Sequence, residues 1–130
     1  MRVDEGLGWR LVVDRSRDPF PVLIGGEAWA MELTSDEALA LADGVALLRS
    51  QHHQLADRLM DEEDLELDWE RDRLWIGLSL RQGSWSLRFV LEGGGLRRSV
   101  EAGWDDGASP AIALALETLP GLLSPGSAAH

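Results

Sequence analysis

Cysteine, lysine, asparagine and tyrosine are absent from the 130-residue chain. The absence of cysteine excludes disulfide bonds, thiolate metal sites and cysteine nucleophiles. No stretch approaches the run of about 18 apolar residues that a membrane-spanning helix needs. The first residues also lack the apolar core of a signal peptide. We therefore expect a cytoplasmic protein with no membrane partner.

Positive charge is scarce as well. Twelve basic residues, all arginine, stand against 23 acidic residues, and the formal net charge is -11. A strong negative balance keeps a protein soluble and repels anionic polymers and anionic membranes. Neutralisation of phosphates by arginine or lysine supplies most of the affinity of nonspecific nucleic-acid binding. The charge therefore disfavours nucleic acid as a partner, although a local basic face would escape the average.

The strongest pattern lies between Asp64 and Trp104, where four segments alternate between apolar and polar residues. These segments are 64–70, 73–81, 84–92 and 96–104, and short polar or glycine-rich breaks separate them. Alternation with a period of two is typical of strands that bury one face. We expect an antiparallel four-stranded meander.

Three shorter strands are expected earlier, over residues 8–14, 22–24 and 27–33. Thr34 to Glu37 has the pattern of a capping box and predicts the start of a helix, which the apolar spacing extends to about residue 60. A second helix is expected over 111–119, capped by Ser109 and ended by Pro120. This order predicts a single α+β domain of antiparallel sheets over residues 1–121, with 122–130 as a disordered tail.

A narrow apolar stripe runs along the long predicted helix. Its residues are Leu41, Val45, Leu48, His52, Leu55 and Leu59. The helix would be about as long as a domain of this size is wide. Such a helix lies across a whole sheet or reaches a second subunit, and the stripe is our candidate interface for a homodimer.

The outward face of the meander is the candidate binding surface. By alternation it carries one tryptophan among arginines: Arg73, Trp75, Arg81, Arg88 and Arg97. A tryptophan among arginines on an open sheet can stack a base and follow a phosphate backbone. In the alternative interpretation, the long helix or a partner's sheet covers this face, and Trp75 is a core residue.

Catalytic and metal-binding motifs are not recognised. The acidic run from Asp61 to Asp64, continued by the acidic residues of 66–70, lacks the spacing and the glycine of a calcium loop. We expect a solvated helix end and strand face, whose charges can also pair with Arg73 and Arg81 across strands. The pair His52-His53 has no partner at zinc-ligand spacing. No serine has a nucleophile motif. We expect no enzyme, no metal and no cofactor.

Five segments resemble a known family, domain of unknown function 1818, which comprises small proteins of cyanobacteria and plant plastids. The segments are Gly8-Trp9-Arg10, Phe20 to Trp29 with Glu32-Leu33-Thr34 following, Leu59 to Glu63, Trp85 to Phe89, and Val100 to Trp104. The resemblance spans residues 6–118. It implies an α+β fold similar to that of the Whirly and transcriptional-coactivator binders of single-stranded DNA, with subunits paired through helices. The family assigns no activity to any residue.

From these patterns we predict a non-enzymatic binding or regulatory protein that acts through protein–protein contacts, as a homodimer in a cyanobacterium-like cytoplasm. The alternative is a transcriptional regulator that binds single-stranded nucleic acid on the outer face of the meander. A small-molecule-binding domain is the third hypothesis. The sequence does not identify the partner.

Overall fold

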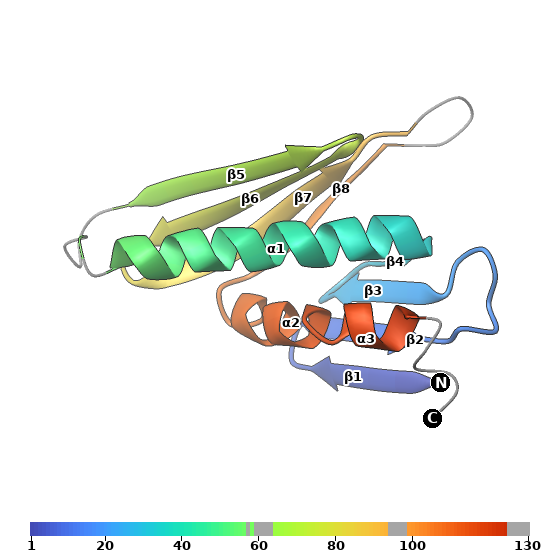
Figure 1. Cartoon of the computed structure of the whole chain (residues 1–130). Helices are drawn as coiled ribbons and strands as arrows, with labels where there is room; N and C mark the ends of the chain where they lie inside the picture. The colour runs from blue at the N-terminus through green and yellow to red at the C-terminus, as the bar shows by residue number, and fades with distance from the viewer. Residues whose placement is uncertain (57, 59–63, 94–98, 125–130) are drawn as a thin grey trace.

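The computed structural model describes residues 1–56, 58, 64–93 and 99–124. Its described part forms two four-stranded antiparallel sheets, each a meander in chain order, and three helices (Figure 1). The first sheet consists of β1 (Arg2–Gly6), β2 (Trp9–Val13), β3 (Val22–Gly26) and β4 (Ala30–Leu33). The second consists of β5 (Leu65–Arg71), β6 (Leu74–Arg81), β7 (Ser84–Leu91) and β8 (Val100–Trp104). The helices are α1 (Ser35–Ala56), α2 (Ser109–Leu116) and α3 (Leu119–Leu123). The predicted α+β class is confirmed.

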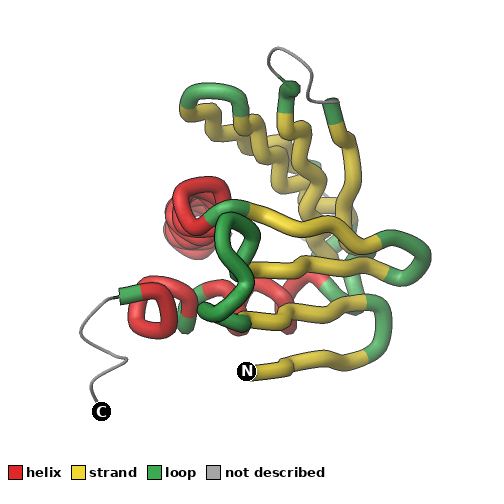
Figure 2. The backbone as a smooth tube through the Cα atoms, turned by 90° about the vertical axis from the view of Figure 1, so that its right-hand side faces the viewer, coloured by secondary structure: helices red, strands yellow, loops and turns green. Residues whose placement is uncertain are grey.

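The helices lie to one side of the sheets. Helix α1 contacts β5 and β6 of the second sheet, while α2 contacts β2 of the first and β7 of the second. Figure 2 shows the helices to one side and the strands to the other. Within the described residues, the opposite faces of both sheets are not covered by a helix.

The capping box at the start of α1 is confirmed. The Thr34 backbone N–H donates to Glu37 Oε1 at 2.8 Å, and the Glu37 N–H donates to Thr34 Oγ1 at 3.2 Å. Each side chain thus satisfies a backbone donor at the helix terminus. The helix is described to Ala56, and of the four residues that we predicted beyond it, 57, 59 and 60 lie outside the described part.

Helix α1 approaches the second sheet most closely at Gly44. A Cβ atom there would lie 2.5 Å from Ile76 Cδ1 and closer still to the Trp69 ring. A side chain at this position would overlap both neighbours, so glycine permits the contact. The approach fixes α1 on the inner face of β5 and β6.

Strand β1 was not predicted. It pairs with β2 in the register Val3 to Val12, around a turn in which Gly8 has a φ of 78°. All but one of its residues are exposed, so neither face is continuously apolar. Hydrophobic periodicity therefore carried no signal for this strand.

The single second helix that we predicted is two helices. Ser109 is the first residue of α2 and does not cap it; residue 108 holds the N-cap position and makes no side-chain capping hydrogen bond. The fully buried Ser109 hydroxyl instead accepts a hydrogen bond from the Leu87 N–H at 3.0 Å. Pro120 stands in the first turn of α3, where a missing N–H costs nothing. Leu122 and Leu123 pack against the core, so a disordered tail beginning at 122 is wrong. Residues 125–130 of that predicted tail lie outside the described part.

One hydrophobic core runs through both sheets. Trp29 from the loop before β4, Phe89 from β7 and Trp104 from β8 form an aromatic cluster, with ring centroids 5.3 to 5.6 Å apart. Their contacts join the inner faces of the two sheets. The aromatic cluster therefore sets how the second sheet, with its exposed outer face, is held against the first.

Candidate functional site

The outer face of the second sheet presents Trp75 half-buried. Helix α1 packs on the other face of this sheet, against Trp69 and Ile76. The interpretation that the long helix covers Trp75 is therefore wrong. The indole is an accessible aromatic surface on the outer face.

Three neighbours hold the Trp75 indole in place. Its Nε1–H donates to Asp68 Oδ2 of β5 at 3.2 Å, and the Arg88 guanidinium of β7 lies 5.2 Å from the ring centroid. A Cβ atom on Gly77, two residues along β6, would lie 2.5 Å from the ring at Trp75 Cη2. The ring therefore lies flat over Gly77, with a hydrogen bond on one side and a cation–π contact on the other. Such an arrangement orients the ring before any partner arrives.

Arg81 lies on the same face but is occupied by carboxylates. Its Nη1 is 3.0 Å from Asp64 Oδ2 and its Nη2 is 2.5 Å from Glu66 Oε1. Glu66 also accepts a hydrogen bond from the Ser79 hydroxyl at 2.7 Å. The predicted cross-strand pairing is thus confirmed for Arg81. Each exposed pair adds little stability, but together they neutralise the guanidinium that a phosphate would require.

The remaining two predicted arginines do not join this group in the described structure. Arg73 lies at the turn between β5 and β6 and lines a pocket instead. Arg97 lies outside the described residues. Of the predicted face, the structure brings Trp75 and Arg88 into direct contact and places Arg81 farther along the same strand as Trp75.

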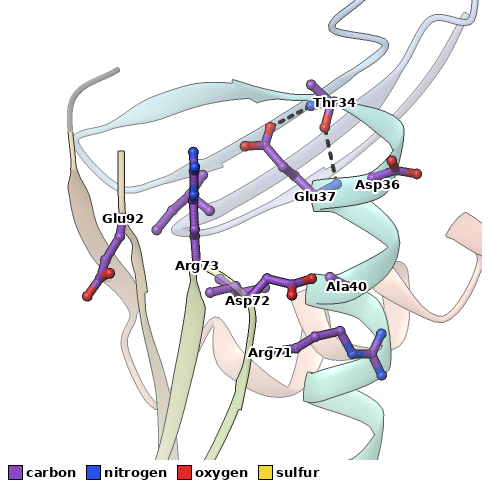
Figure 3. A pocket seen from close by; sticks show the side chains of 10 residues that line it. Thr34, Asp36, Glu37, Ala40, Arg71, Asp72, Arg73 and Glu92 are labelled. Atoms are coloured by element: carbon purple, nitrogen blue, oxygen red, sulfur yellow. Dashed lines mark hydrogen bonds between the residues drawn. The ribbon is translucent and has the colours of Figure 1, made fainter. Parts of the chain in front are cut away.

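The pocket at Arg73 has a volume of about 420 Å³ and opens between the first turn of α1 and the β5–β6 turn (Figure 3). Its charged lining residues are Asp36, Glu37, Arg71, Asp72, Arg73 and Glu92. The partners of Arg71 do not line the pocket: its Nη1 donates to Asp43 Oδ2 at 3.1 Å, and its guanidinium lies over the Trp69 ring. Because acidic and basic side chains both line this open pocket, its charge selects no single class of small molecule.

The helix stripe that we proposed as a dimer interface is largely core. Leu41, Val45 and Leu48 are 2%, 2% and 0% exposed in the single chain, so they are not available to a second copy. This corrects the prediction: the stripe packs α1 onto its own sheets. Leu55 is half-buried, and Leu59 lies outside the described residues.

His52, the polar member of that stripe, packs beside Trp85 with the ring centroids 6.0 Å apart. Burial in this contact lowers the pKa of His52 below its ordinary value of about 6.5, and the nearby positive groups of His53 and Arg49 lower it further. The neutral imidazole is therefore favoured in the folded protein. His52 acts as a packing residue at this position.

The described part of the chain offers neither a metal site nor a membrane-spanning helix. No group of three or more histidine, aspartate or glutamate side chains lies close enough together there to hold a metal ion. No helix among the same residues is long and apolar enough to cross a bilayer.

Alternation in the sequence identified the arginines of the outer face and predicted carboxylate partners for them on the neighbouring strand, but it did not place those carboxylates beside Trp75. Glu66, Asp68 and Glu70 alternate with apolar residues, and their pairing with β6 places them beside Ser79, Gly77 and Trp75. The alternation was visible in the sequence. The missing information was the register, which makes these carboxylates the neighbours of Trp75.

The comparisons with known proteins agree with the fold and assign no activity. A family model described as "Domain of unknown function (DUF1818)" matches residues 4–119. The chain is also similar to a crystal structure described as a protein with unknown function from the DUF155 family of Prochlorococcus sp. NATL2A. The two share 36% identity over 92% of this chain and 98% of that one, with a TM-score of 0.86. No curated protein matches the chain significantly.

Proposed function

Because the chain belongs to the domain of unknown function 1818 family, whose description names no reaction, we propose a function from its surface: a non-enzymatic module that binds another protein. The observation that carries this proposal is Trp75, an accessible aromatic ring held by Asp68, Gly77 and Arg88. Fixed tryptophans flanked by arginine are typical anchors of protein interfaces, because little conformational entropy is lost when they are covered.

The charges around Trp75 favour a protein over a nucleic acid. The outer face of the second sheet carries five described carboxylates, those of Asp64, Glu66, Asp68, Glu70 and Glu101. Two described arginines, Arg81 and Arg88, lie among them, and Arg81 is already paired. A phosphate backbone on this face would meet net repulsion.

One observation supports single-stranded nucleic acid as the second candidate. The Arg88 guanidinium over the Trp75 ring provides a cation and an aromatic plane together, as proteins that stack bases do. The likeness to the Whirly class, which suggested this activity, stays a prediction. Binding to an oligonucleotide at low salt would favour this candidate, and the same protein preparation can be tested for it.

The experiment compares proteins retained from a native extract by the immobilised wild type and by two variants. Trp75→Ala removes the anchor, whereas Phe20→Ala removes an aromatic ring that is 39% exposed before β3 and serves as the control. We expect a retained protein whose yield falls at least tenfold with Trp75→Ala and is unchanged with Phe20→Ala. Equal yields on all three supports would contradict the proposal.

Homodimerisation is a separate part of the proposal. Light scattering measures it directly, because one chain has a mass of 14.3 kDa and a dimer twice that. A mass that stays at the single-chain value at high protein concentration would exclude the dimer. The binding function of the Trp75 face does not depend on this result.

A further inference from the structure

We propose that the free edge of β5 is a docking site for a positively charged protein segment, which adds to the second sheet as an extra strand. This inference rests on the proposed binding function and deepens it by naming the chemistry of the partner. The partner segment is extended, with basic and apolar side chains in alternation. Three features of β5 carry the inference: its open backbone, its two different faces and its charge.

Among the described residues, nothing pairs with the backbone of β5 along one side. Strand β5 pairs with β6, and no other described strand pairs with it, so it forms the outer edge of the sheet in Figure 1. Arg71 and Leu74 close a two-residue hairpin and therefore exchange hydrogen bonds. Pairing alternates from there, so Glu66, Asp68 and Glu70 direct their N–H and C=O groups away from β6. These groups form the template on which another strand can add.

The other edge of this sheet differs. The Gly103 carbonyl oxygen of β8 accepts a hydrogen bond from Trp29 Nε1 at 3.1 Å. That side chain belongs to the loop before β4 and lies against the edge, so β8 does not present an equally open backbone. The comparison favours β5 as the edge for an added strand.

The two faces of β5 select side chains of alternating kind. On the outer face, the carboxylates of Glu66, Asp68 and Glu70 lie beside the edge. On the inner face, Leu65, Leu67 and Trp69 are only half-buried. An added strand would place every second side chain next to a carboxylate and the others next to an apolar residue.

Helix α1 extends the apolar inner face beyond the strand. Leu47 is 47% exposed and lies one helical turn after Asp43, which binds Arg71 at the end of β5. It also follows Gly44, which contacts Trp69, by three residues. Leu47 is therefore on the flank of α1 that faces β5. Apolar side chains of an added strand would cover it together with Leu67 and Trp69.

Charge decides between a basic partner and a second copy of the chain. Two β5 strands paired edge to edge would bring the three outer carboxylates of one copy beside those of the other. Like charges on neighbouring strands are destabilising, whereas opposite charges stabilise the pair. The same carboxylates repel nucleic acid. A segment with lysine or arginine at alternate positions is thus the occupant that matches both faces.

Charged edge strands also protect proteins from aggregation without binding anything, and the experiment must separate these two roles.

The probe is a blocked heptapeptide of alternating lysine and valine, as long as β5. Two control peptides keep its length: one groups the lysines at one end, and the other replaces lysine with glutamate. Calorimetry on the full wild-type chain should show binding of the alternating peptide at least tenfold tighter than that of either control. Equal affinity for the two lysine peptides would mean charge attraction alone and would overturn the docking site, as would no binding.

Two substitutions at one residue separate the backbone from the charge. Among the described residues, Glu70 makes no hydrogen bond or ion pair that a substitution would remove. Glu70→Gln removes only the charge and should lower the affinity for the alternating peptide a few-fold. Glu70→Pro also removes an outward N–H and should lower that affinity at least tenfold. Equal affinities for the two variants would contradict strand addition.

A wild-type measurement keeps the test independent of whether Glu70→Pro folds. Hydrogen exchange with the alternating peptide bound should slow at the amides of Glu66, Asp68 and Glu70, which face the edge. Unchanged exchange at all three would overturn the proposal. A last outcome is that the alternating peptide does not bind the wild type while Trp75→Ala still lowers the yield of a protein retained from native extract. In that case the β5 docking site is wrong and the binding function stands.

Discussion

Trp29 and Trp104 join the two sheets by donating hydrogen bonds in opposite directions. Trp29 Nε1 donates to the Gly103 carbonyl of the second sheet at 3.1 Å, and Trp104 Nε1 donates to the Gly25 carbonyl of the first at 2.8 Å. Their ring centroids are 5.3 Å apart. Each indole thus satisfies a backbone acceptor of the other sheet. This reciprocal pair holds the outer face of the second sheet in a fixed position.

The first prediction concerns this pair. Trp104 is 4% exposed, and Trp104→Phe should lower the free energy of unfolding by about 1–3 kcal/mol, because the Gly25 carbonyl loses its donor in a buried site. Urea denaturation measures the change. Phe20→Leu, on a partly exposed residue, is the control and should change stability by less than about 0.5 kcal/mol. A Trp104→Phe variant as stable as the control would contradict the role of the pair.

The second prediction concerns the contact between α1 and the second sheet. Gly44→Ala should destabilise the protein by about 1–3 kcal/mol, because the added Cβ overlaps Trp69 and Ile76. Helix propensity alone would give the opposite sign, a gain of about 1 kcal/mol. Thermal unfolding of the variant therefore decides between the two effects, and an increase in stability would show that the contact is looser than described.

The third prediction concerns Ser109. Its hydroxyl accepts from the Leu87 N–H at 3.0 Å and lies 2.9 Å from the Trp104 carbonyl, to which it can donate. Ser109→Ala leaves the buried Leu87 N–H without this acceptor and should cost about 1–3 kcal/mol. Ser50→Ala, on an exposed position of α1, should be neutral or slightly stabilising. Equal unfolding midpoints for the two variants would rule out this role for Ser109.

The fourth prediction concerns pH. The pKa of His52 is lowered in the folded state. The unfolded chain therefore binds more protons than the folded protein as the pH falls through about 6.5. The stabilising contribution of the neutral imidazole is present above that value and is lost as the pH falls through the folded pKa. The urea midpoint of the wild type should therefore drop more than that of His52→Gln between about pH 8 and 5.5. Parallel drops would contradict the prediction.

The sequence predicted the second sheet well because its strands bury one face continuously. Leu74, Ile76 and Leu78 alternate with outward residues, so period and burial agree. Strand β1 lacked this signal, since its pairing with β2 is made by backbone groups rather than by a buried side-chain row. Local chemistry was equally informative at Thr34, where the capping residues are adjacent in the sequence.

The candidate site depended on relationships that periodicity does not contain. The spacing of Leu41, Val45 and Leu48 fits a core stripe and a dimer interface equally well, and only the packing of α1 separates the two. In the same way, alternation placed Trp75 and Arg81 on one face, but the register with β5 determines that carboxylates surround them. Pairing across strands, rather than residue type, therefore decides the character of this surface.

The central claim is that the outer face of the second sheet binds a protein through Trp75. Fluorine NMR of protein labelled with 5-fluorotryptophan reports separately on its six tryptophans, and loss of one signal in Trp75→Phe assigns Trp75. Addition of the protein retained from native extract should shift or broaden the Trp75 resonance and leave that of Trp9, in the first sheet, unchanged. An unchanged Trp75 resonance in the bound complex would contradict the claim.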